Sequence, residues 1–98
     1  MCLYKSIDSF LVQLKIGPNP VDHFLYIQIN QAGIIWQGAE IFNTEGRLIQ
    51  RIELKLSGLQ LQNAFNFNQY AKGVYFLKCY FLIDHQITIT KTIQIYKT

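Results

Sequence analysis

The sequence predicts an all-β protein, specifically a seven-stranded antiparallel, immunoglobulin-like β-sandwich with Greek-key connections. Its 98 residues are the usual length of one domain with a single core. Apolar and polar residues alternate almost throughout, which is the period of β-strands. Turn-forming residues separate these segments at intervals of roughly 8 to 15 residues, a spacing typical of sandwich folds.

The first predicted strand runs from Phe10 to Ile16. Residues 1–15 are expected to form a lead-in that contains part of this strand, and residues 16–98 are expected to form the domain itself. The same region also has apolar residues at the helical spacing i, i+4, i+7, namely Ile7, Leu11 and Leu14. A strand is favoured over a helix, because Pro18 follows closely and disfavours helical backbone before it.

The second predicted strand, Phe24 to Asn30, alternates cleanly between apolar and polar residues from Leu25 to Ile29. Pro18 and Pro20 precede it. Proline has no N–H to donate to a β-ladder, so the chain before this strand is expected to turn rather than pair.

Two further strands, Ala39 to Phe42 and Arg47 to Leu54, are expected to pair as a hairpin. The apolar residues of the second strand, Leu48 among them, are expected to share its apolar face. The turn begins with Asn43 and ends with Gly46, the residue types that a type I turn prefers at its first and fourth positions. Gly46 can also take a positive φ without strain.

A short strand, Ala64 to Phe67, and a turn that ends at Gly73 precede the most apolar strand, Val74 to Ile83. Because this strand is apolar on both faces, it is expected to be central in its sheet. Gly73 is predicted to need a positive φ at the end of the turn. Tyr75 is predicted to plant its ring in the core and to bond its hydroxyl to main chain, as a tyrosine corner does.

The last predicted strand is Gln86 to Lys97, in which Ile93 and Ile95 belong to the apolar phase that faces the core. Lys91 falls in the same phase. Burying its charge unpaired is costly, so it must lie near a sheet edge or extend its ammonium to solvent. Lys97 lies past the last apolar position, where its charge is expected to stay hydrated.

Charge and hydropathy exclude several classes of protein. Nine Lys and Arg against six Asp and Glu give a net charge of +3, but the basic residues are scattered, so nucleic acid is not an expected partner. No apolar stretch approaches the ~18 residues of a membrane-spanning helix. The N-terminus also lacks the apolar stretch of a secretory signal. If the protein is exported, its N-terminal export signal is expected to lie outside this chain.

Residue types suited to catalysis or metal binding have no workable spacing. No serine lies in a nucleophile elbow and no glycine-rich phosphate loop occurs. Cys2 and Cys79 lack metal-ligand spacing with His23 and His85, and both histidines are expected to be exposed in loops. Cys79 is expected to be a small buried apolar residue and Cys2 a thiol at a frayed end. The sequence therefore predicts a non-enzymatic protein with no cofactor and no metal site.

Trp36 stands in the apolar, glycine-flanked segment Gly33 to Gly38 and has two interpretations. In the favoured one, its ring packs over the end of the sandwich core. In the other, the ring is a stacking platform for a sugar or part of a docking patch.

Four blocks of the sequence carry a resemblance to a known family. They are Gly-Pro-Asn-Pro-Val-Asp-His-Phe-Leu-Tyr-Ile (Gly17 to Ile27), Ala-Glu-Ile-Phe-Asn-Thr-Glu-Gly-Arg-Leu-Ile (Ala39 to Ile49), Phe-Asn-Phe-Asn-Gln-Tyr-Ala-Lys-Gly-Val-Tyr-Phe-Leu-Lys (Phe65 to Lys78) and Thr-Lys-Thr-Ile-Gln-Ile-Tyr-Lys (Thr90 to Lys97). In this order they resemble the type A C-terminal sorting domain of the type IX (Por) secretion system of Bacteroidota. One block alone is a weak signal, whereas four in order with family-like spacing are specific.

The resemblance implies a non-catalytic C-terminal sorting signal that directs a cargo through the type IX system, by way of the periplasm, to the outer-membrane surface or the medium. It implies the type IX translocon and its sortase-like peptidase as partners. The alternative is a free-standing adhesion or carbohydrate-binding sandwich that uses Trp36 and exposed tyrosines. The residues expected to carry the sorting motif, for structure or for recognition, are Pro18, Asn19, Pro20, Asn43, Gly46, Gly73, Tyr75, Lys91 and Lys97.

Overall fold

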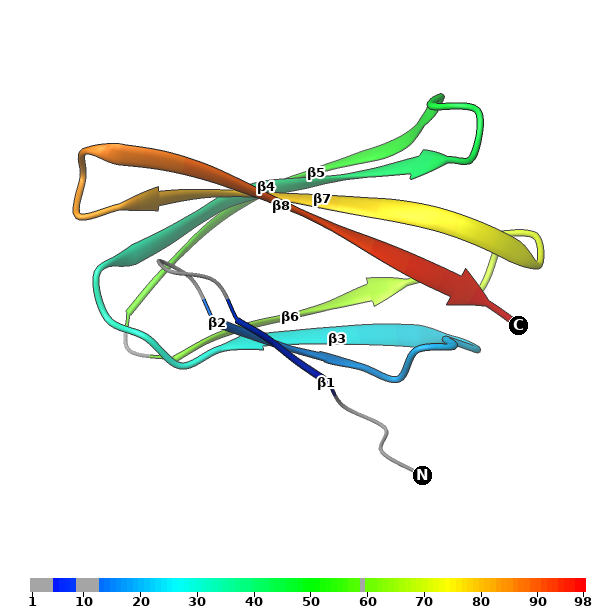
Figure 1. Ribbon diagram of the computed structural model, residues 1–98, viewed down its shortest axis with the longest axis horizontal. Helices are drawn as coiled ribbons and strands as arrows, with labels where there is room; N and C mark the ends of the chain where they lie inside the picture. The colour runs from blue at the N-terminus through cyan, green and yellow to red at the C-terminus, as the bar shows by residue number, and fades with distance from the viewer. Residues whose placement is uncertain (1–4, 9–12, 59) are drawn as a thin grey trace.

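The computed structural model describes residues 5–8, 13–58 and 60–98, and every regular element in them is a β-strand (Figure 1). No helix in this part of the chain is long and apolar enough to cross a membrane. The eight strands of the described residues are β1 (Lys5–Asp8), β2 (Gln13–Gly17), β3 (Phe24–Ile29), β4 (Ile34–Asn43), β5 (Leu48–Ser57), β6 (Leu61–Asn66), β7 (Gly73–Ile83) and β8 (Ile87–Lys97).

The strands form two antiparallel sheets that lie one above the other in Figure 1. The first sheet has the order β1-β2-β3-β6, and the second sheet has the order β5-β4-β7-β8. The chain crosses between sheets after β3, β5 and β6, so that β3 pairs with β6 and β4 pairs with β7. This is the Greek-key connectivity of immunoglobulin-like sandwiches, and it confirms the predicted fold class.

The N-terminal region differs from the single strand predicted at Phe10 to Ile16. An antiparallel hairpin of β1 and β2 takes its place, with Lys5 opposite Ile16, and β2 also pairs with β3. Residues 9–12 lie outside the described residues. The described residues therefore contain eight strands rather than seven. The sequence has no Gly or Pro between Asp8 and Gln13 to indicate that one strand ends there and another begins.

The core fills the space between the two sheets with the inward-facing side chains of each strand. In β3, the predicted alternation is confirmed, because Leu25 and Ile27 are fully buried whereas Phe24 and Tyr26 are 43% and 48% exposed. Each fully buried aliphatic side chain contributes about 1.5–3 kcal/mol relative to an exposed one. The outward aromatic residues of β3 are partly exposed and do not contribute this full burial energy.

A β-bulge changes the inward face of β4 halfway along the strand. The register with β7 shifts between Trp36 and Gly38, so Gln37 is an extra residue. The buried apolar side chains switch phase there, from Trp36 before the bulge to Ala39 and Ile41 after it. β4 is therefore one long strand, of which the sequence predicted only the second half.

Trp36 lies inside the core rather than over its end, which corrects the interpretation favoured from sequence. Its ring is fully buried between Phe65 of β6 and Phe81 of β7, at centroid distances of 5.9 and 5.8 Å. Its Nε1–H donates to the main-chain carbonyl of Gly38 over 3.2 Å. No face of the ring reaches the surface, so Trp36 offers no platform to a sugar.

The turn between β4 and β5 is the predicted one. The N–H of Gly46 donates to the carbonyl of Asn43 over 3.1 Å, and Gly46 has a φ of 80°. A second bulge, between Ile41 and Phe42, shifts the register of this hairpin. The extra residue on β5 breaks the alternation of that strand. Leu48 pairs with Phe42 and is 41% exposed, out of phase with Ile52, whereas it was expected on the apolar face of β5.

β7 lies between β4 and β8, which confirms that the strand apolar on both faces is central. β8 is an edge strand, and Lys91 lies half-buried on it, opposite Cys79. The predicted edge location of Lys91 is thus confirmed. Cys79 is buried as expected, and burial raises the pKa of its thiol to about 12, so the thiol stays neutral.

Gly73 begins β7 with the positive φ that the sequence predicted, 152°. An added Cβ would meet no atom within 4 Å, so a side chain there strains the backbone without a clash. Gly73→Val is expected to lower the free energy of unfolding by about 1–3 kcal/mol, measured by urea denaturation. Lys72→Val, next in sequence and exposed, is the matched control and should change it by about 0.5 kcal/mol at most. Equal effects of the two variants would contradict this account of the turn.

Candidate functional site

The Pro-Asn-Pro block joins the first sheet to the last strand of the second sheet. Both X-Pro bonds of the block, those before Pro18 and Pro20, are cis. The side-chain Nδ2 of Asn19 donates to the carbonyl of Gln94 over 3.0 Å, and its Oδ1 accepts from the N–H of Tyr96 over 2.9 Å. One side-chain amide therefore pairs with the outer edge of β8 as a neighbouring strand would.

Val21 continues this contact with its main chain. Its N–H donates to the carbonyl of Tyr96 over 2.7 Å, and its carbonyl accepts from the N–H of Thr98 over 2.9 Å. These bonds make a parallel bridge with Lys97, and the Val21 side chain is fully buried. The first block of the motif thus covers the C-terminal half of the β8 edge.

The remaining blocks meet at the same end of the sandwich. In the register of the second sheet, Gly73 lies opposite Lys97, and Tyr75 lies opposite Asn43. Figure 1 shows the β4–β5 hairpin, the start of β7, the β2–β3 connection and the C-terminus together at the right-hand end. Asn43 stabilises its turn because its Oδ1 accepts from two main-chain N–H groups, of Glu45 and of the residue after Gly46.

Tyr75 forms the tyrosine corner that the sequence predicted. Its hydroxyl donates to the carbonyl of Ala71 over 2.6 Å, across the turn between β6 and β7. Its ring packs edge-on against Phe67 at 6.0 Å and lies 5.4 Å from the ring of Tyr70. Tyr70 in turn donates a hydrogen bond to Gln50 of β5. The turn before β7 is thereby tied to both sheets.

The structure brings together all but one of the residues expected to carry the motif. The exception is Lys91, which pairs with Cys79 near the middle of β8. The roles of these residues in recognition stay predictions. The residues that meet at one end are Pro18, Asn19, Pro20, Asn43, Gly46, Gly73, Tyr75 and Lys97.

The family model of the secretion system C-terminal sorting domain matches residues 15–96 of the chain. The chain belongs to this family. Neither a search of curated proteins nor one of solved structures gave a match. The family provides the C-terminal sorting signal of the type IX (Por) secretion system, found in Bacteroidota. The sorting domain therefore acts with the type IX machinery in export to the cell surface or the medium.

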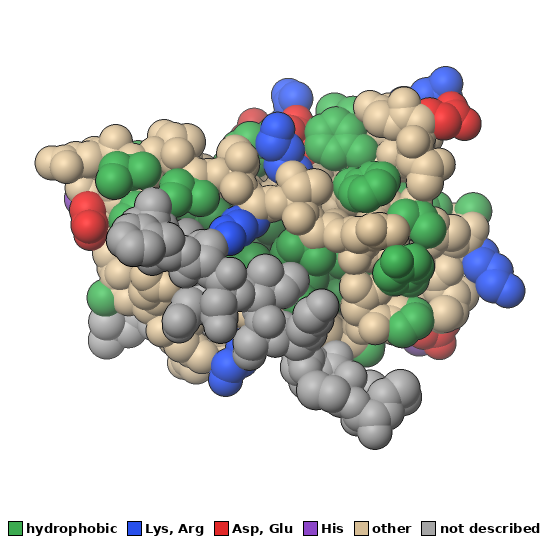
Figure 2. Space-filling model, in the orientation of Figure 1, with side chains coloured by type: hydrophobic (Ala, Val, Ile, Leu, Met, Phe, Trp, Pro, Cys, Tyr) green, Lys and Arg blue, Asp and Glu red, His purple; other side chains and the backbone are tan. Residues whose placement is uncertain are grey.

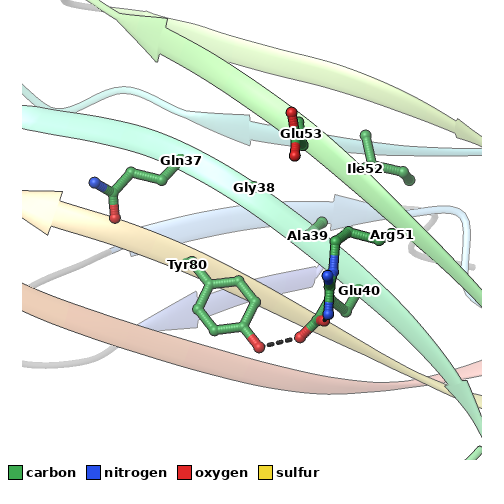
Figure 3. A pocket seen from close by; sticks show the side chains of 8 residues that line it. All are labelled: Gln37, Gly38, Ala39, Glu40, Arg51, Ile52, Glu53 and Tyr80. Carbon is green, nitrogen blue, oxygen red and sulfur yellow. Dashed lines mark hydrogen bonds and ion pairs between the residues drawn. The ribbon is translucent and has the colours of Figure 1, made fainter. Parts of the chain in front are cut away.

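The sorting domain also holds a buried acid, Glu40, which the sequence analysis did not single out. Glu40 lies on the outer face of the second sheet, in a shallow depression of about 380 Å³ (Figure 3). Its side chain is 11% exposed. One carboxylate oxygen accepts from Nε and Nη2 of Arg51, at 3.0 and 2.8 Å, and the other accepts from the hydroxyl of Tyr80.

These contacts keep the carboxylate ionised. The hydrogen bond from Tyr80, and next those from Arg51, lower the pKa of Glu40 and outweigh the effect of burial, which raises it. The same bond to Glu40 raises the pKa of the Tyr80 hydroxyl. The cluster ties β4, β5 and β7 together through charge-assisted hydrogen bonds.

Sequence reasoning missed this cluster because the hairpin register is irregular. Regular pairing outward from the Asn43 to Gly46 turn would place Glu40 opposite Gln50. The bulge between Ile41 and Phe42 moves the register by one residue and puts Arg51 opposite Glu40 instead.

Other titratable groups of the sorting domain are placed as expected. His23 and His85 are both exposed. His23 bonds through Nδ1 to Asn68 over 2.7 Å, and its Nε2 lies 3.3 Å from Asp22. His85 lies in the β7–β8 turn, where it and Asp84 have positive φ. Within residues 5–8, 13–58 and 60–98, no group of three or more His, Cys, Asp or Glu could hold a metal ion.

Asn19→Ala is expected to lower the free energy of unfolding by about 1–3 kcal/mol, because it leaves two main-chain groups of β8 without their partner. Asn30→Ala is the matched control, since Asn30 is exposed and accepts only a long 3.4 Å bond from Gln28. Chemical denaturation measures both. If the two variants lose the same stability, the Asn19 bridge does not stabilise the fold.

Tyr80→Phe is expected to destabilise the domain by about 1 kcal/mol at pH 7, because Glu40 loses a donor. In the folded domain, the pKa of Glu40 lies below its ordinary value of 4.5. The stability that ionised Glu40 contributes is therefore fully present above pH 4.5, and it is lost as the pH falls through the folded pKa. The difference between wild type and variant should therefore shrink between pH 7 and pH 3. Denaturation curves at both pH values measure it, and a constant difference would count against the hydrogen bond to ionised Glu40.

Proposed function

We propose that the type IX translocon recognises this sorting domain in its folded form, at the end of the sandwich where the four blocks meet. The observation that supports the proposal most directly is the pairing of the Asn19 side chain with Gln94 and Tyr96. It brings the first block against the last, although they lie at opposite ends of the sequence. A partner that reads both blocks together requires the fold that joins them.

In this proposal, the recognised unit is residues 16–98, and residues 1–15 are a lead-in. All four blocks lie within residues 17–97. After transit through the periplasm, a sortase-like peptidase removes the domain as the cargo is attached to the outer-membrane surface.

The domain itself performs no chemistry in this proposal. Its buried carboxylate, Glu40, is held ionised by Tyr80 and Arg51. The thiol of Cys79 is buried and neutral. Groups of these kinds lack the access or the basicity that catalysis needs.

A reporter export assay tests the proposal. The full chain is fused behind a signal peptide and a fluorescent reporter in a Bacteroidota host with a working type IX system. We expect the reporter at the cell surface or in the medium, and we expect a reporter without the chain to stay in the periplasm. Periplasmic retention of the full fusion in the wild-type host would overturn the proposed function.

The substitution Lys97→Gln removes the side-chain charge at the C-terminal end but keeps the main-chain hydrogen bonds there. Deleting residues 97 and 98 would also remove the N–H of Thr98 that donates to Val21, so substitution is the cleaner change. We expect reduced export with an almost unchanged melting temperature, because the Lys97 ammonium bonds only to the adjacent Thr98 carbonyl. Lys55→Gln, exposed on β5 and outside the motif residues, is the matched control. Full export of Lys97→Gln would show that this charge is not read.

A further inference from the structure

Core packing explains the inward-facing apolar residues of the motif blocks but not the outward-facing ones. In β7, Tyr75 and Leu77 are buried, whereas Val74 and Phe76 alternate with them and face outward, half-buried. In β4, Ile41 is buried and the next residue faces outward. These outward residues require a second explanation.

The outward residues lie side by side across all four strands of the second sheet. Phe42 pairs with Leu48 on one side and with Phe76 on the other, while Val74 pairs with Tyr96. Residues directly opposite each other in adjacent strands share a face. We call this surface the outer apolar patch, and it consists of Phe42, Leu48, Val74, Phe76 and Tyr96.

The outer apolar patch is open to solvent and lies at one end of the sheet. Leu48 is 41% and Tyr96 48% exposed. Farther along β8, the outward residues opposite Lys78 and Tyr80 are Thr92 and Thr90, as a solvated face would have. Figure 2 shows hydrophobic side chains at the surface in both halves of the molecule, including a group toward the β4–β5 hairpin and the C-terminus. A clustered apolar patch on a small domain marks an interaction site more often than scattered residues do.

Cations surround this patch. Lys78 follows Phe76 on the same face, where its ammonium lies 5.3 Å from the Tyr80 ring. Arg47 and Lys72 are exposed in the two turns that border the patch, and Glu45 is an acid in one of these turns. Glu40 lies opposite Lys78, and its charge is paired with Arg51. No salt bridge engages Arg47, Lys72 or Lys78 among the residues that the structure describes. The border is therefore net positive.

We propose that the outer apolar patch is the docking surface for a translocon protein whose contact area is apolar and bordered by carboxylates. This inference rests on the proposed function. Apolar contact supplies the affinity of such an interface, and opposite charges at its border supply orientation and association rate. A second copy of the chain fits less well, because two positive borders would face each other across the interface.

The double variant Leu48→Thr/Tyr96→Thr tests the patch in the export assay with the full chain. Both residues are largely exposed and threonine keeps the strand propensity, so the fold should hold. The matched control is Ile87→Thr, a residue of similar exposure (47%) at the opposite end of β8 and outside the four blocks. We expect about tenfold less surface reporter for the patch variant and no change for the control, with similar melting temperatures for both.

A charge reversal provides the second arm. Lys72→Glu, at the border, should lower export severalfold, whereas Lys55→Glu, exposed on β5 away from the patch, should not. Wild-type export by both the patch variant and Lys72→Glu would overturn the inference while leaving the proposed function intact. A wild-type dimer in sedimentation that the patch variant abolishes would instead identify a second copy as the occupant. Failure of the unmodified chain to export the reporter would overturn the proposed function itself.

Discussion

The pairing of Asn19 with the edge of β8 is the contact on which the functional end of this domain depends. Edge strands present unpaired N–H and carbonyl groups that invite association with other chains. The two prolines beside Asn19 have no N–H, so the segment cannot pair as an ordinary strand. The Asn19 amide supplies both a donor and an acceptor in their place, and Val21 completes the bridge. The block thus covers the edge and joins the two sheets.

Local patterns in the sequence were sufficient to predict most of the fold. Period-two alternation predicted β3 and β8, and a segment apolar on both faces predicted β7. The residue types of the Asn43 to Gly46 turn predicted the hairpin between β4 and β5. The inward faces of β4 and β5 were predicted incorrectly, because each strand contains a bulge and no residue type in the sequence marks a bulge. Trp36 lies inside the core and Leu48 faces solvent, contrary to the predictions for both residues.

The candidate site was predictable only in part, for a related reason. The positive φ of Gly73 and the hydrogen bond of Tyr75 to Ala71 involve only residues close together in sequence, and both were predicted correctly. The contact of Asn19 with β8 joins residues far apart in sequence, so no local pattern contains it. The cluster of Glu40 and Arg51 depends on a register that a bulge shifts. The family resemblance identified the four blocks but did not indicate that they lie together in the folded domain.

Folding and recognition are coupled because alternate residues of the same strands face the core and the solvent. The inward phase of β7 builds the core, and its outward phase builds the outer apolar patch. Shifting a strand by one residue exchanges its two faces completely. A misregistered β7 would therefore present Leu77 outward in place of Phe76, and the patch would no longer form across β4 and β8. A partner that binds the outward phase consequently selects chains whose core is correctly packed, without any contact with the core.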